Sequence, residues 1–327
     1  MNGNKPKLLV QFRRAMVAMA YAESTVKDYA KAVEKYIRFH DMRHPASMGE
    51  VEVGDFVTYL GYVEHLSPES QNKALCAIVL FYNKILFKPL GNISNLRWAR
   101  KKKRLPICYS MEDMRKILEN LQSPYYLIAS LGFGCGLRIG EVLKLRLMDL
   151  DFQRGAIRVV QGKHSKDRDV PLPNKLIKPL KRLSEFRAQE FIIDKKGLSV
   201  SDANLGEAAS FVVEVPKYPE EQFLFVHRKP SVDYSRRVFY RKIYTRQSVD
   251  KALKRAIRIA GIPCVGGFHS LRHSYSTAAI GMGMNIRELQ HYLGHNDINT
   301  TQIYTHVLNN EDQSISSPLS EIGNFKD

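Results

Sequence analysis

Four short segments of this 327-residue chain carry side chains that could act together on a phosphate diester. In chain order the segments are GCGLRIGE (134–141), QGKHSKDRDVPL (161–172), GFHSLRHSYST (267–277) and HYLGHNDINTTQIYTHV (291–307). The side chains of interest are Arg138, Lys163, His269, Arg272, His295 and Tyr304. Each of these residue types alone is more often structural than catalytic, so their combination is the informative feature.

Breaking a phosphodiester without a metal ion requires a nucleophile, an acid for the leaving group and positive charge around the pentavalent transition state. A tyrosine suits the first task, because its aryl phosphate ester keeps the bond energy for rejoining. Arginines suit the non-bridging oxygens, since a guanidinium pairs bidentately with phosphate and stays charged. A lysine on a hairpin can protonate the departing oxygen, and a histidine can accept the phenolic proton near neutral pH.

The order Arg, Lys on a β-turn, His-x-x-Arg, Leu-Gly-His and Tyr resembles that of the tyrosine recombinases, also called phage-type integrases. LRHSYST (271–277) is similar to the family's LRHSFAT, and LGHNDINTTQIYTHV (293–307) is similar to its LGHSxxxTTxxYTHV. The resemblance extends from about residue 10 to about residue 320. It implies an enzyme that cuts and rejoins DNA strands through a 3′-phosphotyrosyl intermediate, with no cofactor and no metal ion.

The resemblance also implies a role for each of the six side chains. Tyr304 is expected to be the nucleophile, and Lys163 the general acid. His269 is expected to be the general base, and His295 to hydrogen-bond the phosphate. The arginines of the first and third segments, Arg138 and Arg272, would clamp the scissile phosphate.

Two positions near these residues leave alternatives open. Lys166 and Arg168 share the hairpin with Lys163, which is preferred as the acid because it matches the family's GKGxKxR pattern, here GKHSKDR. Glu141 lies one helical turn after Arg138. We expect it either to orient an active-site side chain or to be an ordinary acid on the helix surface.

The composition favours a polyanionic partner. Fifty Lys and Arg against 33 Asp and Glu give a net charge of +17 and a pI near 9.6. Such an excess is typical of nucleic-acid binding, although some basic proteins have no such partner. We find no apolar run of membrane-spanning length, no signal peptide and no metal-type cysteine spacing. We therefore expect a cytoplasmic, nucleoid-associated protein with no membrane contact.

The first 98 residues are predicted to form an all-helical domain. Apolar residues recur at helical spacing after Ser24 or Thr25, which could cap a helix to His40, and again from Val51. A third such stripe follows Ser67–Pro68, a typical helix start. By resemblance this region is a four-helix, SAM-like core-binding domain.

A basic linker over 99–108 and a catalytic domain over 109–327 are predicted to follow. Ser110 is a candidate cap for the first catalytic helix, and a period-two pattern over 156–172 predicts a β-hairpin. A divergent insert is expected over about 195–245, and a tail helix over about 313–327. The fold class is thus mainly α with a small antiparallel β-sheet, an α+β catalytic domain. The resemblance implies that both domains form a C-shaped clamp on DNA.

DNA contacts are expected from basic side chains of the linker, the hairpin and the insert. The candidates are Arg97, Arg100, Lys101, Lys102, Lys103, Arg104, Lys166, Arg168, Arg241 and Lys242. A basic stretch by itself is equally typical of a solvated surface.

Within the family, three phrases resemble integron integrases, which insert and excise gene cassettes. They are YIRFHDMRHPASMGEVEVGDFVTYL (36–60), Lys217–Tyr218–Pro219 in the insert, and SPLSEIG (317–323). However, the LPxAL phrase is missing from the insert, and Arg241–Lys242 replace that branch's paired histidines. GLRIGE is also closer to the general recombinase pattern. The alternative is a Xer-like or other mobile-element recombinase that acts on duplex sites.

The expected partners are DNA, as duplex or folded single-stranded sites, and further copies of the chain in a homotetramer on two sites. The insert's aromatic residues are candidates for stacking on bases or for packing on the domain; they are Tyr218, Tyr234, Tyr240 and Tyr244. Two other classes share part of the pattern. A type IB topoisomerase is disfavoured by the small helical first domain, and a DNA-binding relic by the intact catalytic set.

Overall fold

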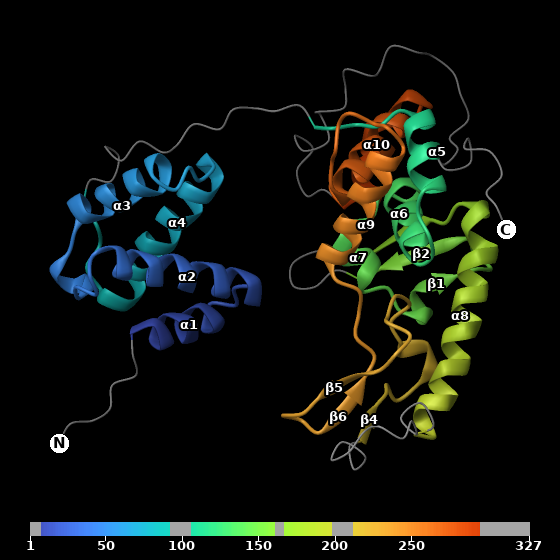
Figure 1. The fold of residues 1–327 in the computed structure, drawn as a ribbon, viewed down its shortest axis with the longest axis horizontal. Helices are drawn as coiled ribbons and strands as arrows, with labels where there is room; N and C mark the ends of the chain where they lie inside the picture. Colours follow the sequence, from blue (N-terminus) through green and yellow to red (C-terminus); the bar gives the residue numbers. More distant parts are fainter. Residues whose placement is uncertain (1–7, 92–105, 161–166, 198–211, 295–327) are drawn as a thin grey trace. The chain divides into compact units, whose positions relative to one another are not determined.

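The computed structural model describes residues 8–91, 106–160, 167–197 and 212–294. The chain is mostly helical, with small β-sheets, and it divides into two compact units, Met1–Arg104 and Leu105–Asp327 (Figure 1). Most of the predicted linker and the whole predicted tail helix lie outside the described residues. Within the described part, no helix is long and apolar enough to span a bilayer.

The first unit is a small helical bundle. Its helices are α1 (Leu8–Ala18), α2 (Glu23–Phe39), α3 (Glu50–Tyr62) and α4 (Pro68–Phe81), the last continuing into a π-helical turn (Tyr82–Leu86). All three predicted apolar stripes face one core, in which Phe12, Tyr36 and Phe56 are fully buried. The Ser67 Oγ accepts a hydrogen bond from the Ser70 amide and caps α4.

One detail of this unit was predicted wrongly. Helix α2 begins at Glu23 after Ala22, so Ser24 and Thr25 lie inside its first turn and cap nothing. A serine or threonine caps a helix only where the backbone is extended, and here Ala22 has that conformation.

The second unit has seven helices among its described residues. They are α5 (Met111–Glu119), α6 (Tyr125–Gly134), α7 (Ile139–Leu143), α8 (Asn174–Lys195), α9 (Arg246–Ile259), α10 (Phe268–Gly281) and α11 (Ile286–Leu293). Helix α6 is apolar on all sides and forms the centre of the core, where it contacts α7, α9 and α10. The Ser110 Oγ accepts from the Asp113 amide, as predicted for the cap of α5.

A three-stranded antiparallel sheet lies beside α7. Its strands are β1 (Leu150–Asp151), β2 (Ala156–Val159) and β3 (Arg168–Pro171), in that order. Val159 pairs with Arg168 and Ile157 with Val170, and all four side chains are buried, because residues two apart on a strand share a face. The predicted hairpin is therefore confirmed, while its tip over 161–166 lies outside the described residues.

The predicted insert contains a second small sheet, at the bottom of Figure 1. Strands β4 (Val212–Glu214), β6 (Val238–Tyr240) and β5 (Ser231–Asp233) lie in that order, with β4 and β6 parallel and β5 and β6 antiparallel. The segment over 223–226 forms isolated bridges, Arg146 with Phe223 and Val226 with Ile243.

Candidate active site

Arg138 is positioned by the tight turn between α6 and α7. Gly136 has a φ of +63°, and a Cβ there would lie 2.5 Å from the Tyr275 ring, so only glycine fits. The turn leaves Arg138 in an extended conformation at the start of α7. Its main-chain N donates to the Glu141 Oε2 at 2.8 Å, and its Nη1 donates to the Glu141 Oε1 at 2.9 Å.

Arg272 is the largest fully buried side chain of the chain's described part, with 2% exposure. Its Nη1 donates to the Gly136 carbonyl at 2.6 Å, and its Nη2 donates to the Leu293 carbonyl at 2.7 Å. It thus connects α10 to the Arg138 turn and to the end of α11. A guanidinium of this kind carries a permanent positive charge, which suits the charge of a phosphate.

His269 stands one turn before Arg272 on α10. The start of this helix is fixed from two sides, because the Phe268 amide donates to Asp250 Oδ1 at 2.9 Å and the Gly266 amide donates to the Tyr109 hydroxyl at 2.7 Å. The His269 imidazole contacts the His273 ring edge-to-face, with 4.5 Å between ring centroids. The predicted His-x-x-Arg pair is therefore held in a fixed place on one helix.

The end of helix α11 accepts hydrogen bonds from three arginines. The Tyr292 carbonyl accepts from Arg168 Nε at 2.7 Å, the Leu293 carbonyl accepts from Arg272 Nη2 at 2.7 Å, and the Gly294 carbonyl accepts from Arg138 Nη2 at 3.2 Å. These are the unpaired carbonyls of a helix C-terminus, which carry partial negative charge. They stabilise a cluster of guanidinium groups that would otherwise repel one another.

Glu141 is the carboxylate of this cluster, and its side chain is only 12% exposed. Burial alone would raise its pKa, but the hydrogen bonds and charges of Arg168 and Arg138 outweigh burial and lower the pKa of Glu141. Of the two roles considered for Glu141, the structure supports orientation of Arg138 and excludes a surface acid.

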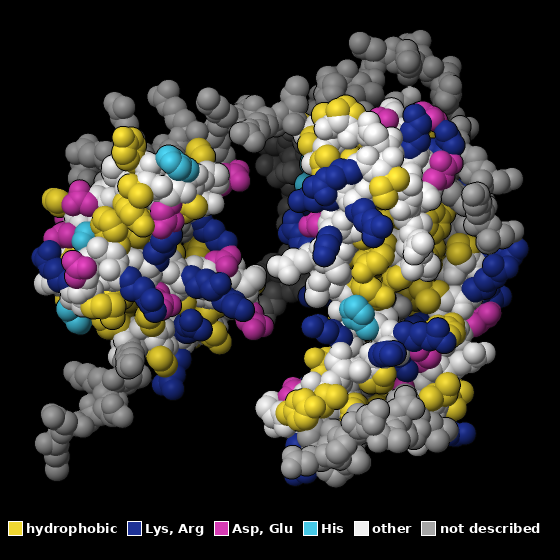
Figure 2. All heavy atoms as spheres, viewed as in Figure 1, with side chains coloured by type: hydrophobic (Ala, Val, Ile, Leu, Met, Phe, Trp, Pro, Cys, Tyr) yellow, Lys and Arg dark blue, Asp and Glu magenta, His cyan; other side chains and the backbone are white. Residues whose placement is uncertain are grey.

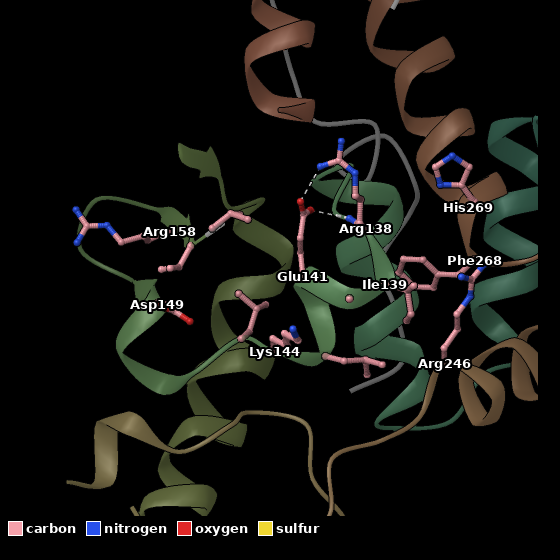
Figure 3. A pocket seen from close by; sticks show the side chains of 14 residues that line it. Arg138, Ile139, Glu141, Lys144, Asp149, Arg158, Arg246, Phe268 and His269 are labelled. Carbon is pink, nitrogen blue, oxygen red and sulfur yellow. Dashed lines mark hydrogen bonds and ion pairs between the residues drawn. The ribbon is translucent and has the colours of Figure 1, made fainter. Parts of the chain in front are cut away.

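Arg138 and His269 line one pocket of about 620 Å³ (Figure 3). The pocket is also lined by cations that motif reasoning missed, namely Lys144, Arg158 and Arg246. Arg158 could have been found, because it alternates with the buried Ile157 and Val159 on β2. Arg246 could not, because only the packing of α9 beside α10 places it there. Figure 2 shows many further Lys and Arg side chains on the visible face of this unit.

Three of the six predicted catalytic side chains are therefore connected in the structure: Arg138 and His269 line the pocket, and Arg272 bonds to the Gly136 carbonyl and lies 4.0 Å from Glu141. Lys163, His295 and Tyr304 lie outside the described residues, as do Lys166 and the basic side chains over 97–104. The described chain stops at Gly294, whose carbonyl accepts from Arg138. No group of His, Cys, Asp and Glu suited to a metal ion occurs among the described residues.

Two predicted DNA contacts are corrected by the structure. Arg168 is 3% exposed and pairs with Glu141 at 2.9 Å, so it cannot present its guanidinium to DNA. Arg241 is 10% exposed and lies between Glu190 and Asp194 of α8. Both arginines compensate buried carboxylates. Lys242 is exposed, and its expected DNA contact stays a prediction.

The ion pairs of Arg241 with Glu190 and Asp194 anchor the insert to α8, and their loss should lower the stability of the protein. Asp194 is 3% exposed and accepts from Arg241 Nη2 at 2.7 Å. Asp194→Asn should leave Arg241 poorly compensated and lower the free energy of unfolding by about 3 kcal/mol in urea titrations. The matched control is Glu214→Gln, which breaks the exposed ion pair with Arg236. It should cost about 0.5 kcal/mol, and equal losses in the two variants would contradict the anchor.

Comparison with known proteins gives the same family as the motifs. The model described as Phage integrase family matches residues 109–311, and the model described as Phage integrase, N-terminal SAM-like domain, matches residues 8–92. An Integrase/recombinase of Escherichia coli is 36% identical over 323 residues, covering 97% of this chain and 94% of that protein. Tyrosine recombinase XerD of Listeria innocua is 26% identical over 307 residues, covering 89% and 91%.

Solved structures share the fold. The XerH site-specific recombinase bound to palindromic difH substrate has a TM-score of 0.62 at 21% identity, over 93% of this chain and 82% of that one. A lambda integrase dimer bound to a core site has a TM-score of 0.61 at 16% identity, over 94% and 98%. With both regions matched by family models, the chain belongs to the phage integrase family and is a tyrosine recombinase, an enzyme that cleaves and rejoins DNA.

Proposed function

We propose that the protein is a site-specific recombinase of the integron-integrase type, which inserts and excises gene cassettes. The observation that carries the reaction is that Arg138 and His269 line one pocket, while the buried Arg272 bonds to the Gly136 carbonyl in the turn that positions Arg138. The positive charge of these arginines, held by main-chain carbonyls, suits a phosphate whose negative charge grows in the transition state. The donors are thus already in place before the phosphate binds, and the bound DNA replaces solvent at them.

In the proposed reaction the Tyr304 oxygen attacks the scissile phosphorus while Arg138 and Arg272 bind its non-bridging oxygens. The tyrosine–phosphorus bond forms, and the bond from phosphorus to the 5′ oxygen breaks. His269 takes the phenolic proton, and Lys163 gives a proton to the departing 5′ oxygen. His295 hydrogen-bonds the phosphate. Rejoining runs the same steps backwards with a 5′ hydroxyl from the partner strand.

The base assigned to His269 predicts a pH profile. Displacement of water by the surrounding protein lowers the pKa of His269 below 6.5, and the charges of Arg272, Arg138 and Arg246 lower it further. Because the neutral imidazole is the active base, adduct formation should be level around neutral pH and fall only below 6.5 as the imidazole becomes protonated. Single-turnover rates from about pH 5 to about pH 8 test this.

Arg246→Gln removes one of the charges that lower the pKa of His269, so it should move the inflection to higher pH. Arg258→Gln, at the far end of α9, is the control and should leave the inflection in place. An inflection that does not move in the first variant would argue against His269 as the base.

The insert supports the integron type. It carries the Lys217–Tyr218–Pro219 phrase, with the Lys217 ammonium over the Tyr218 ring at 5.1 Å, and both Tyr218 and Tyr234 are exposed large aromatics. Exposed aromatic side chains are suited to stacking on unpaired bases. Tyr244 instead packs on the His227 and Tyr125 rings, which favours a structural role for that tyrosine.

The second candidate is a Xer-like or other mobile-element recombinase that acts on duplex sites. It is favoured by the relative named XerD, which matches along most of the chain. It is also favoured by Arg241, which is committed to α8 where the integron branch has one of its paired histidines. Under either reading we propose that the two units close around DNA as a clamp. We further propose that four copies act on two sites and that the protein is cytoplasmic and associated with the nucleoid.

Recombination of one site in two forms separates these candidates. The full-length protein is given a cassette site as a folded single-stranded hairpin and as a perfect duplex, each with the same partner site. The integron type predicts that the hairpin recombines faster and that Tyr218→Ala or Tyr234→Ala removes this preference. Equal or better use of the duplex would support the Xer-like alternative, and relaxation of supercoils without recombinants would contradict both.

A further inference from the structure

We propose that Arg168 is a positioning residue of the recombinase site, which holds the Glu141 carboxylate on Arg138 and Arg168 so that it does not neutralise Arg272. This proposal rests on the function proposed above, since it concerns the charge available to a phosphate. Arg168 enters from β3 and is 3% exposed, so any effect on catalysis must pass through its neighbours.

Arg168 is fixed at two points. Its Nε donates to the Tyr292 carbonyl at 2.7 Å, and its Nη2 donates to the Glu141 Oε2 at 2.9 Å. The remaining Nη1 is buried and has no hydrogen-bond partner within the described residues. The buried charge of Arg168 is therefore compensated by the Glu141 carboxylate and by the Tyr292 carbonyl at the end of α11.

Glu141 in turn is shared among three guanidinium groups. Its oxygens lie 2.9 Å from Arg138 Nη1, 2.9 Å from Arg168 Nη2 and 4.0 Å from Arg272 Nη1. One negative charge among three positive ones leaves a surplus, which the α11 carbonyls stabilise without neutralising it. The same oxygen that accepts from Arg168, Oε2, is the one nearest to Arg272.

Loss of Arg168 would remove a guanidinium donor that lies within hydrogen-bond distance of that oxygen, and the Arg138 main-chain N would remain as its neutral donor. Because a largely buried carboxylate that loses one charged partner is destabilised, Glu141 would take Arg272, 4.0 Å away, as a closer partner beside Arg138. The charge that Arg272 offers to a phosphate would then be smaller. The expected result is slower chemistry at unchanged DNA affinity, because an interaction important in the transition state is lost.

The test is suppression in a double variant. Single-turnover formation of the covalent adduct is measured at saturating nicked duplex for wild type, Arg168→Met, Glu141→Gln and the double variant. Arg168→Met should be about 100-fold slower than wild type, with the dissociation constant for DNA within about twofold. The double variant should regain about tenfold over Arg168→Met, because the neutral amide cannot neutralise Arg272.

A purely structural role for Arg168 predicts the opposite, a double variant as slow as Arg168→Met or slower, and that result would overturn the proposal. Arg168→Lys keeps a charge for Glu141 and should remain within about tenfold of wild type. If thermal unfolding shows that Arg168→Met does not fold, Arg168→Lys decides the test. A folded Arg168→Lys whose rate is more than about tenfold below that of wild type would then overturn the proposal.

The matched control is the exposed pair of Arg115 and Glu112 on α5, 2.7 Å apart. Arg115→Met, Glu112→Gln and their double variant should leave the rate unchanged. Wild-type protein that binds its site but forms no adduct would refute the proposed function. An active wild type whose Arg168→Met defect is not suppressed by Glu141→Gln refutes only the role of Arg168.

Discussion

Tyr304→Phe is expected to abolish the covalent protein–DNA adduct and to leave the affinity for the recombination site unchanged. The substitution removes one oxygen, the proposed nucleophile, and keeps the ring. No phosphotyrosyl bond can form without that oxygen, so the loss should be complete, at least about a millionfold in the chemical step. DNA binding depends on other contacts with the phosphate backbone and should persist.

The measurement is a denaturing gel of protein incubated with a nicked duplex site, beside a binding titration at matched salt. Tyr62→Phe is the control, because Tyr62 is highly exposed at the end of α3 in the first unit, and its adduct should match wild type. An adduct that persists in Tyr304→Phe would assign the nucleophile to another residue.

Arg272→Gln is expected to slow adduct formation by about 100- to 1,000-fold at saturating DNA. Glutamine loses both the charge and the fork that joins the Gly136 and Leu293 carbonyls, at 2.6 and 2.7 Å. The charge acts on the reacting phosphate, and the two carbonyl contacts hold the guanidinium in position. The loss should therefore appear in the rate of the chemical step more than in the dissociation constant for DNA.

Arg272→Lys separates the two contributions. A lysine keeps the charge but cannot reach both carbonyls as a planar fork, so it should recover only part of the rate. Thermal unfolding of each variant, with Arg115→Gln as an exposed control, checks that the fold persists. A loss below about tenfold in Arg272→Gln would argue against a clamp by this arginine.

Much of the fold, and the place of half of the proposed catalytic set, could be predicted from sequence for identifiable physical reasons. Helical and period-two patterns record burial directly, which is why α2, α4 and the β2–β3 hairpin are found. The arginines and His269 follow from motifs whose spacing is local, such as His-x-x-Arg on α10. Their convergence is tertiary, and it was expected only through the family's motif order.

The errors have physical causes too. Arg168 was grouped with exposed cations because it is charged, although its two-residue spacing from Val170 places it on the buried face of β3. Its partner Glu141 is 27 residues away, so no local pattern shows the pair. Arg241 is likewise matched to Asp194, 47 residues earlier on α8. Buried ion pairs between distant elements leave no periodic signal.

The acceptors at the end of α11 are main-chain atoms, and this affects how the site can change over generations. Every amino acid has a carbonyl, so substitutions at Tyr292 or Leu293 cannot delete the groups that accept from Arg168 and Arg272. Selection on these arginines therefore acts on the path of the backbone rather than on the side chains that follow it. A substitution at Tyr292 or Leu293 would instead act through packing, most strongly at Leu293, which is fully buried.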